Sequence, residues 1–332
     1  MSLKNYYFRK GLLRSLNVQV TNANTQHISV LLEESLSFLK PLKNEIFVDA
    51  TLGLGGHSEA ILTTQAKVIG IDQDDAAIQF AKVRLEHFKE HFEVYQANFS
   101  EIKEVLELAE VEKVDGILAD LGVSSLQLDS ETRGFSFRFN APLDMRMNPE
   151  SGDETAAELL KRLSEFEIAK IIYEFGEEKL SRRIARRIVE RRERGEAIET
   201  TKELADICSS SARSEERIHP ATRTFQALRI AVNHELDIIE KFIVDSVDSL
   251  KPNGRLVIIS FHSLEDRIVK QVFQKLAGKC TCPPRFPICI CNAQKKIEIL
   301  TRKPVVPTDS EMHENPRSRS AKLRACKKLE LN

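Results

Sequence analysis

The sequence predicts an α/β fold in which a mostly parallel, Rossmann-like sheet is interrupted by an inserted all-helical domain. Short β-branched runs alternate with helical patterns in the first 120 residues, the middle of the chain is helical without a convincing strand, and strand patterns then return. Strand–helix alternation is typical of a parallel sheet covered by helices on both faces.

Four expected strands come first. They are Ile46–Ala50, Lys67–Asp72, Phe92–Gln96 and Val114–Asp120. The segments 58–63, 75–88 and 99–108 carry apolar residues at helical spacing. Right-handed crossovers place the carboxyl ends of all such strands at one edge, where sheets of this class bind ligands.

The rest of the chain sets the domain boundaries. Residues 121–149 are loop-like and 155–211 are helical, 224–250 is expected as one long helix, and 251–254 as a turn before a buried strand at 255–260. Residues 296–301 and 321–327 are expected as edge strands. We therefore expect a variable or poorly ordered arm at 1–26, a core at 27–126 and 217–332, and a helical substrate-recognition insert at 127–216.

Composition narrows the class of protein. Of the 332 residues, 42% are hydrophobic and 30% charged, as in ordinary globular proteins, and the net charge is -1. A nucleic-acid partner would therefore meet a local basic patch. No apolar run approaches the roughly 18 residues that cross a bilayer, and the N-terminus lacks a signal-peptide pattern. We expect a cytoplasmic protein, either a monomer or a homodimer.

A glycine-rich turn follows the first expected strand. Gly53, Gly55 and Gly56 would let the backbone approach a ligand closely. The dinucleotide pattern would need its third glycine where Ser58 stands. Asp72 ends the second strand about 20 residues after the first glycine, where an acid binds ribose hydroxyls. NAD and S-adenosylmethionine are both compatible with these features.

Three residues favour S-adenosylmethionine. Asp49 lies just before the glycine turn, where a carboxylate would serve a cationic ligand, whereas NAD needs donors for its pyrophosphate. Phe99 follows the third strand and would flank an adenine ring, and Asp120 ends the fourth. Each of them alone is also compatible with a turn or helix-capping role.

Long motifs in this chain resemble the MraW family, the ribosomal RNA small subunit methyltransferases H. They are DATLGLGGHS at 49–58, DGILADLGVSSLQLD at 115–129, RGFSFRFNAPLDMRMNP at 133–149, HPATRTFQALRIAVN at 219–233, GRLVIISFHSLEDRIVK at 254–270 and NPRSRSAKLR at 315–324. The resemblance implies a Rossmann-like S-adenosylmethionine-dependent methyltransferase that methylates the exocyclic N4 of a cytosine in 16S ribosomal RNA, free or in the small ribosomal subunit. The cofactor positions that it implies are Gly55, Gly56, His57, Asp72, Phe99, Asp120 and Gln127. The first 26 residues and the segment 278–292 depart from the shared pattern.

Four residues are candidates for catalysis. Methyl transfer needs an in-line approach and an oxygen that accepts a hydrogen bond from N4. Asp120 lies where amino methyltransferases carry an acidic or amide residue, but the prolines and aromatic that usually follow are missing, so a role for the cofactor alone stays open. Ser124, Asp144 and His262 are the others, with an ion pair to Arg146 as the alternative for Asp144 and a structural hydrogen bond as the alternative for His262.

Basic and aromatic residues are candidates for RNA binding. Arg223, Arg317, Arg319 and Arg324 are candidate phosphate ligands, although helix-surface charge is the default for Arg223. The arginine-rich stretch 182–194 is interspersed with glutamates, so a salt-bridged face is an equal alternative. A base must leave its stack to be methylated, and Phe135, Phe137 or Phe139 would stack on it unless they pack in the core.

Four of the six cysteines are clustered. Cys280, Cys282, Cys289 and Cys291 would suit a structural tetrahedral zinc, with free thiols and redox pairing as alternatives. The isolated Cys208 and Cys326 are expected as small buried residues. For the whole protein, two rival functions remain beside the methyltransferase: an NAD-linked oxidoreductase, and an RNA-binding ribosome-assembly factor with a vestigial cofactor site.

Overall fold

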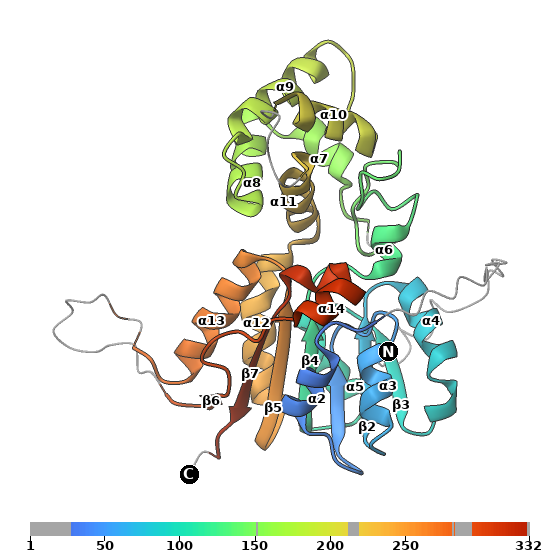
Figure 1. The fold of residues 1–332 in the computed structure, drawn as a ribbon, viewed down its shortest axis with the longest axis vertical. Helices are drawn as coiled ribbons and strands as arrows, with labels where there is room; N and C mark the ends of the chain where they lie inside the picture. The colour runs from blue at the N-terminus through green and yellow to red at the C-terminus, as the bar shows by residue number, and fades with distance from the viewer. Residues whose placement is uncertain (1–27, 151, 212–218, 281, 283–293, 331–332) are drawn as a thin grey trace, which may run out of the picture.

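A helical layer stands over one edge of a seven-stranded sheet (Figure 1). The computed structural model describes residues 28–150, 152–211, 219–280, 282 and 294–330. The expected N-terminal arm, 1–26, lies outside these residues.

The sheet confirms the predicted Rossmann-like α/β class. Its strand order is β3-β2-β1-β4-β5-β7-β6, and the first five strands are parallel, whereas β7 is antiparallel to both β5 and β6. The strands are β1 (Ile46–Asp49), β2 (Lys67–Asp72), β3 (Phe92–Gln96), β4 (Val114–Asp120), β5 (Leu250–Ser260), β6 (Ile297–Ile299) and β7 (Lys322–Lys328).

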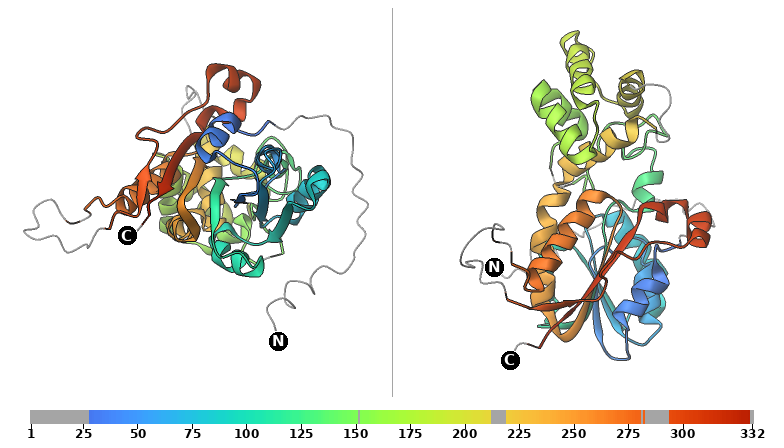
Figure 2. Two further views of the ribbon diagram at one scale, coloured as in Figure 1. Left: turned by 90° about the horizontal axis from the view of Figure 1, so that it is seen from below. Right: turned by 60° about the vertical axis from the view of Figure 1, so that its left-hand side comes forward.

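Helices cover both faces of the sheet (Figure 2). In β5, Leu256 and Ile258 pack on one face, and Val257 and Ile259 on the other. Because both faces are buried, this strand is a continuous apolar run rather than an alternating one. The first face is covered by α5 (Ile102–Leu108), α12 (Glu235–Ser249) and α13 (Ser263–Leu276), and the second by α2 (Leu32–Leu39), α3 (Gly56–Leu62) and α4 (Asp75–Arg84). The sheet domain also contains four short helices: η1 (Glu86–Phe88), η2 (Phe99–Glu101), α14 (Asp309–Glu314) and η3 (Pro316–Ser320).

The helical layer has a hydrophobic core of its own. Thr155 and Ser164 begin two of its helices with capping boxes, in which each hydroxyl accepts a backbone N–H and a glutamate three residues on reaches back. Ile168 and Ile172 lie at the centre of this core. The helices are α6 (Ser125–Asp129), α7 (Ala156–Arg162), α8 (Glu165–Gly176), α9 (Ser181–Glu193), α10 (Thr201–Ser211) and α11 (Ala221–Asn233).

Four sequence-based expectations about the second half of the chain differ from the structure. The single helix at 224–250 is broken at His234, whose φ of 51° is left-handed, so α11 ends there and α12 begins. Phe225 and Leu228 of α11 pack in the helical layer, so the expected boundary at 217 falls before a helix of that layer. Residues 251–254 lie inside β5, next to an irregular register with β4, rather than in a separate turn. β7 lies inside the sheet, not at its edge.

Two further expectations concern burial and membranes. Cys208 and Cys326 are buried, as predicted. Within the described ranges no helix combines the length and the apolar character needed to cross a bilayer.

Candidate cofactor and substrate site

The turn between β1 and α3 is shaped by glycines. Gly55 has a φ of 76° and precedes α3, a conformation that glycine adopts without strain. Gly56 is needed for a different reason, since a Cβ atom there would lie 2.1 Å from the hydroxyl of Ser29. The turn therefore brings bare backbone to the carboxyl edge of the sheet.

Asp72, at the end of β2, is held by backbone donors on both sides. Its Oδ2 accepts the N–H of Gly53 at 2.8 Å and its Oδ1 accepts the N–H of Asp74 at 2.9 Å. Burial raises the pKa of Asp72 to about 6, and the nearby charges of Asp74 and Asp49 also raise it. The carboxylate is thus fixed in place while each oxygen keeps a lone pair for a ligand.

Two more carboxylates end the neighbouring strands. Asp49, at the end of β1, is 1% exposed and accepts the hydroxyl of Ser58 at 2.7 Å, and burial raises its pKa to about 6. Asp120 ends β4, where its backbone N–H donates to the Thr51 hydroxyl at 2.6 Å. The Oδ1 atom of Asp120 is buried and has no hydrogen-bond partner among the described residues. Burial and then the charges of Asp49 and Glu265 raise the pKa of Asp120 well above its usual value.

These three carboxylates make a negatively charged site without a counter-charge. Within the described part of the chain, no Lys, Arg or His forms an ion pair with Asp49, Asp72 or Asp120. Asp49, Asp72 and Asp120 are not among the described residues that lie close enough to share one metal ion. The group whose potential ligand atoms lie within 4.8 Å of one another is Glu235, His262 and Glu265. The site therefore favours an extended ligand that carries positive charge.

The other cofactor positions implied by the resemblance lie around this edge. His57, on α3, donates from Nε2 to the carbonyl of Val30 at 3.0 Å, and burial lowers its pKa to about 4, so the ring is neutral. Phe99 begins η2 directly after β3 and packs edge-on against Phe242, with ring centroids 5.0 Å apart. One side of the Phe99 ring is therefore held by the core.

Gln127 and Ser124 belong to one capping box. The Ser124 hydroxyl accepts the backbone N–H of Gln127 at 3.3 Å, and Gln127 Oε1 accepts the backbone N–H of Ser124 at 3.0 Å. Gln127 then donates from Nε2 to Asp74 Oδ2 at 3.0 Å. Arg133 donates to the same oxygen at 3.0 Å. Ser124 thus caps α6, and Asp74 connects the turn after β2 to α6 and to the loop that follows it.

Asp144 forms an ion pair with Arg146, the alternative to a catalytic role. Arg146 donates to it from Nε at 2.7 Å and from Nη2 at 2.8 Å. Burial raises the pKa of Asp144, but the hydrogen bonds and charge of Arg146 outweigh this and leave the pKa below its usual value. The carboxylate is therefore ionised, with both oxygens occupied.

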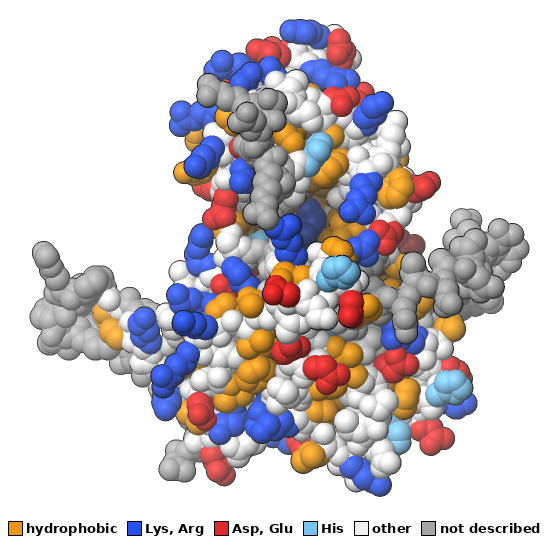
Figure 3. Space-filling model, viewed as in Figure 1, with side chains coloured by type: hydrophobic (Ala, Val, Ile, Leu, Met, Phe, Trp, Pro, Cys, Tyr) orange, Lys and Arg blue, Asp and Glu red, His pale blue; other side chains and the backbone are white. Residues whose placement is uncertain are grey.

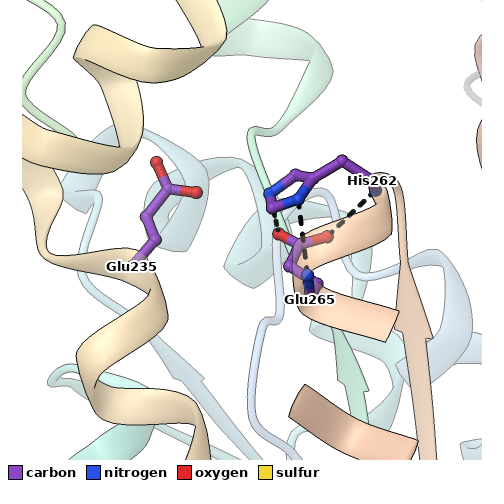
Figure 4. Close-up of side chains that lie close together, drawn as sticks. All are labelled: Glu235, His262 and Glu265. Atoms are coloured by element: carbon purple, nitrogen blue, oxygen red, sulfur yellow. Dashed lines mark hydrogen bonds and ion pairs between the residues drawn. The ribbon is translucent and has the colours of Figure 1, made fainter. Parts of the chain in front are cut away.

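His262 points into a buried cluster with two glutamates (Figure 4). It caps the start of α13, where its Nδ1 accepts the backbone N–H of Glu265 at 3.4 Å and its Nε2 lies 3.0 Å from Glu265 Oε1. Glu235 belongs to the same cluster and is bound through both oxygens by Arg229, at 2.9 Å each. His262 thus has the structural hydrogen bond that was its alternative role.

Comparison with known proteins decides the family. The sequence profile described as the MraW methylase family matches residues 24–329. The chain belongs to the MraW methylase family. Its relatives include "Ribosomal RNA small subunit methyltransferase H" from Pelobacter propionicus, 50% identical over 315 residues that cover 92% of this chain and 100% of the relative. The protein of the same name from Clostridium botulinum (strain Kyoto / Type A2) is 51% identical over 309 residues, which cover 92% and 99%.

Solved structures are similar at lower identity. An rRNA methylase from Streptococcus thermophilus is 13% identical, with a TM-score of 0.42, over 92% of this chain and 99% of that one. A SAM-dependent O-methyltransferase from Thermotoga maritima is 8% identical, with a TM-score of 0.41, over 93% and 70%.

The three phenylalanines of this MraW methylase lie largely in the helical layer. Phe135 is buried in its core. Phe137 is partly buried and stacks on His219, with ring centroids 4.4 Å apart. Phe139 is half-buried. Phe135 and Phe137 thus pack in the helical layer, as expected for the alternative to stacking on a base.

The predicted phosphate ligands have different environments. Arg324 is 7% exposed and bound by Asp266 at 2.6 and 3.2 Å, so it does not present its charge to RNA as expected. Arg317 forms an ion pair with Asp129, and Arg319 is exposed. Arg223 lies 3.3 Å from Glu178. Lys and Arg side chains are spread over the helical layer in Figure 3 rather than gathered in one patch.

Three of the seven arginines in the stretch 182–194 hold other parts of the helical layer. Arg187 donates to Ser210 and Ser211, and Arg191 to Glu203. Arg192 donates from one nitrogen to three backbone carbonyls at the end of α7, 2.7 to 3.0 Å away. These three arginine side chains therefore connect neighbouring helices of the helical layer.

Of the clustered cysteines, Cys280 is exposed and Cys282 is partly buried, and Cys289 and Cys291 lie outside the described residues. The structural zinc stays a prediction.

Sequence reasoning missed the groups that hold the site residues in place. Asp74, Arg133 and Glu265 were not singled out, although all three are hydrogen-bonded to predicted site residues or their partners. The spacing of His262 and Glu265 is that of a capping box, which was a usable signal. Arg133 had no local signal, because its partner lies 59 residues away.

Proposed function

We propose that this chain transfers a methyl group from S-adenosylmethionine to the exocyclic N4 of a cytosine in 16S ribosomal RNA. Family membership establishes a methylase, and the relatives named above act on small-subunit ribosomal RNA according to their names. The observation that carries the choice of methyl donor is the set of three carboxylates at the ends of β1, β2 and β4, of which Asp49 is buried and Asp72 and Asp120 are partly buried.

These residues fit the proposed cofactor. Asp72 would accept the ribose hydroxyls, and Asp49 and Asp120 would lie near the cationic end, where the buried Oδ1 of Asp120 lacks a partner among the described groups. Phe99 would flank the adenine, with Gly55, Gly56, His57 and Gln127 around it. When bound, the cofactor supplies an electrophilic methyl group on a sulfonium. NAD fits less well, because carboxylates repel a pyrophosphate and no cation among the described residues pairs with them.

Asp120 is the residue that we assign to the acceptor nitrogen. Its Oδ1 would accept a hydrogen bond from N4–H, which localises the nitrogen lone pair that cytosine otherwise delocalises into its ring. Its raised pKa suits it to receive the proton that N4 loses. Asp144 is paired with Arg146 and His262 is held by Glu265, so both are assigned to positioning. Ser124 is assigned to the capping of α6.

Methyl transfer to small subunits from a strain that lacks the enzyme tests the proposal. Labelled cofactor should give N4-methylcytidine by nucleoside mass spectrometry, and naked 16S RNA in parallel shows which substrate is used. Asp120→Asn should lower kcat by about 100-fold or more, as for loss of a proton-handling group. A silent assay with intact cofactor binding would instead favour the assembly-factor alternative, and tight NAD binding without S-adenosylmethionine binding would favour the oxidoreductase.

A further inference from the structure

The outer face of α8 exposes two large aromatic side chains. Phe166 is 78% exposed and Tyr173 is 62% exposed. Aromatic side chains of this size are normally buried or at an interface, because their exposed rings lose the stabilisation of apolar burial. Among the described large hydrophobic residues, few are as exposed.

The two rings and a lysine lie on one stripe of the helix. Positions 166, 170 and 173 are separated by four and three residues, so their side chains are neighbours on one face. Lys170, between the aromatics, is exposed. The opposite face, with Ile168 and Ile172, is buried in the core of the helical layer. The aromatics are therefore not needed for the packing of α8. We call Phe166, Lys170 and Tyr173 the α8 stripe.

The α8 stripe leads to the carboxyl edge of the sheet. Glu177, four residues after Tyr173, accepts the Ser263 hydroxyl at 2.6 Å and Arg267 Nη2 at 3.1 Å. Ser263 begins α13, one residue after His262. The C-terminal end of α8 thus lies against the turn after β5, as Figure 1 also shows for α8 and α13.

Positive charge accompanies the stripe. The side chains of Lys170, Arg182 and Arg183 are exposed, and none of these three side chains forms a hydrogen bond or ion pair with the parts of the chain that are described. Two of the nearby acids are already occupied, since Glu167 binds the Ser164 cap and Glu177 binds Ser263 and Arg267. Lys170 is therefore an exposed cation between the two rings, and Arg182 and Arg183 are exposed in the first turn of α9, with Glu174 as an exposed acid on α8 itself.

We propose that the α8 stripe is a stacking platform for single-stranded RNA next to the target cytosine. Bases stack on exposed aromatic side chains whatever their sequence, and neighbouring cations bind the phosphates. Phe166 and Tyr173 would stack flanking bases, and Lys170 with Arg182 and Arg183 would bind the backbone between them. This inference rests on the proposed function for the identity of the substrate, but it assigns the strand to a surface outside the cofactor site.

Binding of a single-stranded RNA of about ten nucleotides, followed by fluorescence anisotropy at fixed salt, tests the platform directly. The double variant F166A/Y173A should raise the Kd by about 10- to 100-fold, as expected for the loss of one or two stacked bases. F166Y/Y173F keeps both rings and should bind within about twofold of the unchanged protein. Lys170→Gln should weaken binding and reduce its salt dependence.

Controls separate this proposal from its alternatives. F80A and V83A remove side chains on α4 that are 46% and 80% exposed, and should leave the Kd for RNA unchanged. The binding of S-adenosylmethionine should be unaffected in every variant. An unchanged RNA Kd for F166A/Y173A overturns the platform, and so does normal RNA binding with a defect only on assembled subunits, which would assign the stripe to a protein. Because RNA binding is measured without methylation, failure of the proposed chemistry is seen separately.

Discussion

Gly53 donates its backbone N–H to Asp72 Oδ2 at 2.8 Å, across the 19 positions that separate them in the sequence. The glycine turn after β1 and the acid after β2 are therefore one unit. Adjacent parallel strands bring them together, since β1 pairs with β2 along its length and Asp49 lies opposite Gly70.

Asp72→Asn tests that unit. The amide would replace one acceptor oxygen with a donor, which would face the backbone N–H of either Gly53 or Asp74. We expect the Kd of S-adenosylmethionine, measured by calorimetry, to rise by about tenfold or more, because a hydrogen bond to a charged group contributes about 1.5–3 kcal/mol. Asp75→Asn, on the exposed first turn of α4, is the matched control. An unchanged Kd for Asp72→Asn would remove Asp72 from the cofactor site.

Asp120→Asn should stabilise the cofactor-free protein near neutral pH. The pKa of Asp120 is raised in the folded state, so the folded protein binds more protons than the unfolded chain above the usual carboxyl pKa, and stability falls as pH rises through that window. An amide removes this penalty of about 1–3 kcal/mol. We expect a Tm higher by several degrees at neutral pH, and little difference below the usual carboxyl pKa, in scanning calorimetry.

In Asp120→Asn, S-adenosylmethionine should raise the Tm by less than it does in the unchanged protein. Saturating S-adenosylmethionine raises the Tm of a protein that binds it in the folded state, and this shift should shrink in Asp120→Asn. A lower Tm without cofactor would show that the Asp120 carboxylate is compensated by a partner in solution.

Local patterns predicted correctly which candidate residues lie at strand ends. Asp49, Asp72 and Asp120 all follow continuous apolar runs, and a buried parallel strand is readable from such a run because both its faces are covered. The break at His234 was not readable. No glycine or proline stands there, and the left-handed turn is imposed by packing α11 on the helical layer and α12 on the sheet.

Ion pairs between residues far apart in the sequence also could not be predicted from local patterns. Arg324 follows the expected edge-strand pattern with other basic residues, but its partner Asp266 lies 58 residues away on α13. A cation in a basic stretch therefore looks free in sequence when it is neutralised in the fold.

Arg229→Met should destabilise the joint between the helical layer and the sheet. Arg229 and Glu235 lie on either side of the α11–α12 break, with side chains 15% and 9% exposed. Removal of the cation leaves a buried carboxylate beside Glu265, and breaking such a pair costs about 3–5 kcal/mol. Urea unfolding of the variant measures this loss. Arg229→Met with Glu235→Gln should recover most of it, and a double variant as unstable as the single one would contradict the pair.

Asp144→Asn should reduce stability modestly and leave chemistry nearly intact. Arg146 keeps the pKa of Asp144 below its usual value, so the pair contributes stability above that value and loses it as pH falls through the lower folded pKa. Because the pair is partly exposed, we expect a loss of about 1 kcal/mol at neutral pH that diminishes in acid, by urea unfolding. A kcat lowered by 100-fold or more would give Asp144 a direct role in proton transfer.

Zinc analysis tests the cysteine cluster. Four thiolates on a short segment suit a tetrahedral structural zinc, so protein purified without chelator should contain about one zinc per chain by mass spectrometry. Cys280→Ser with Cys282→Ser should lose the metal, whereas Cys208→Ala, which changes a buried thiol of α10, should retain it. Because methyl transfer needs no Lewis acid, the metal-free variant should keep its cofactor affinity. Zinc-free wild-type protein would contradict the structural zinc site.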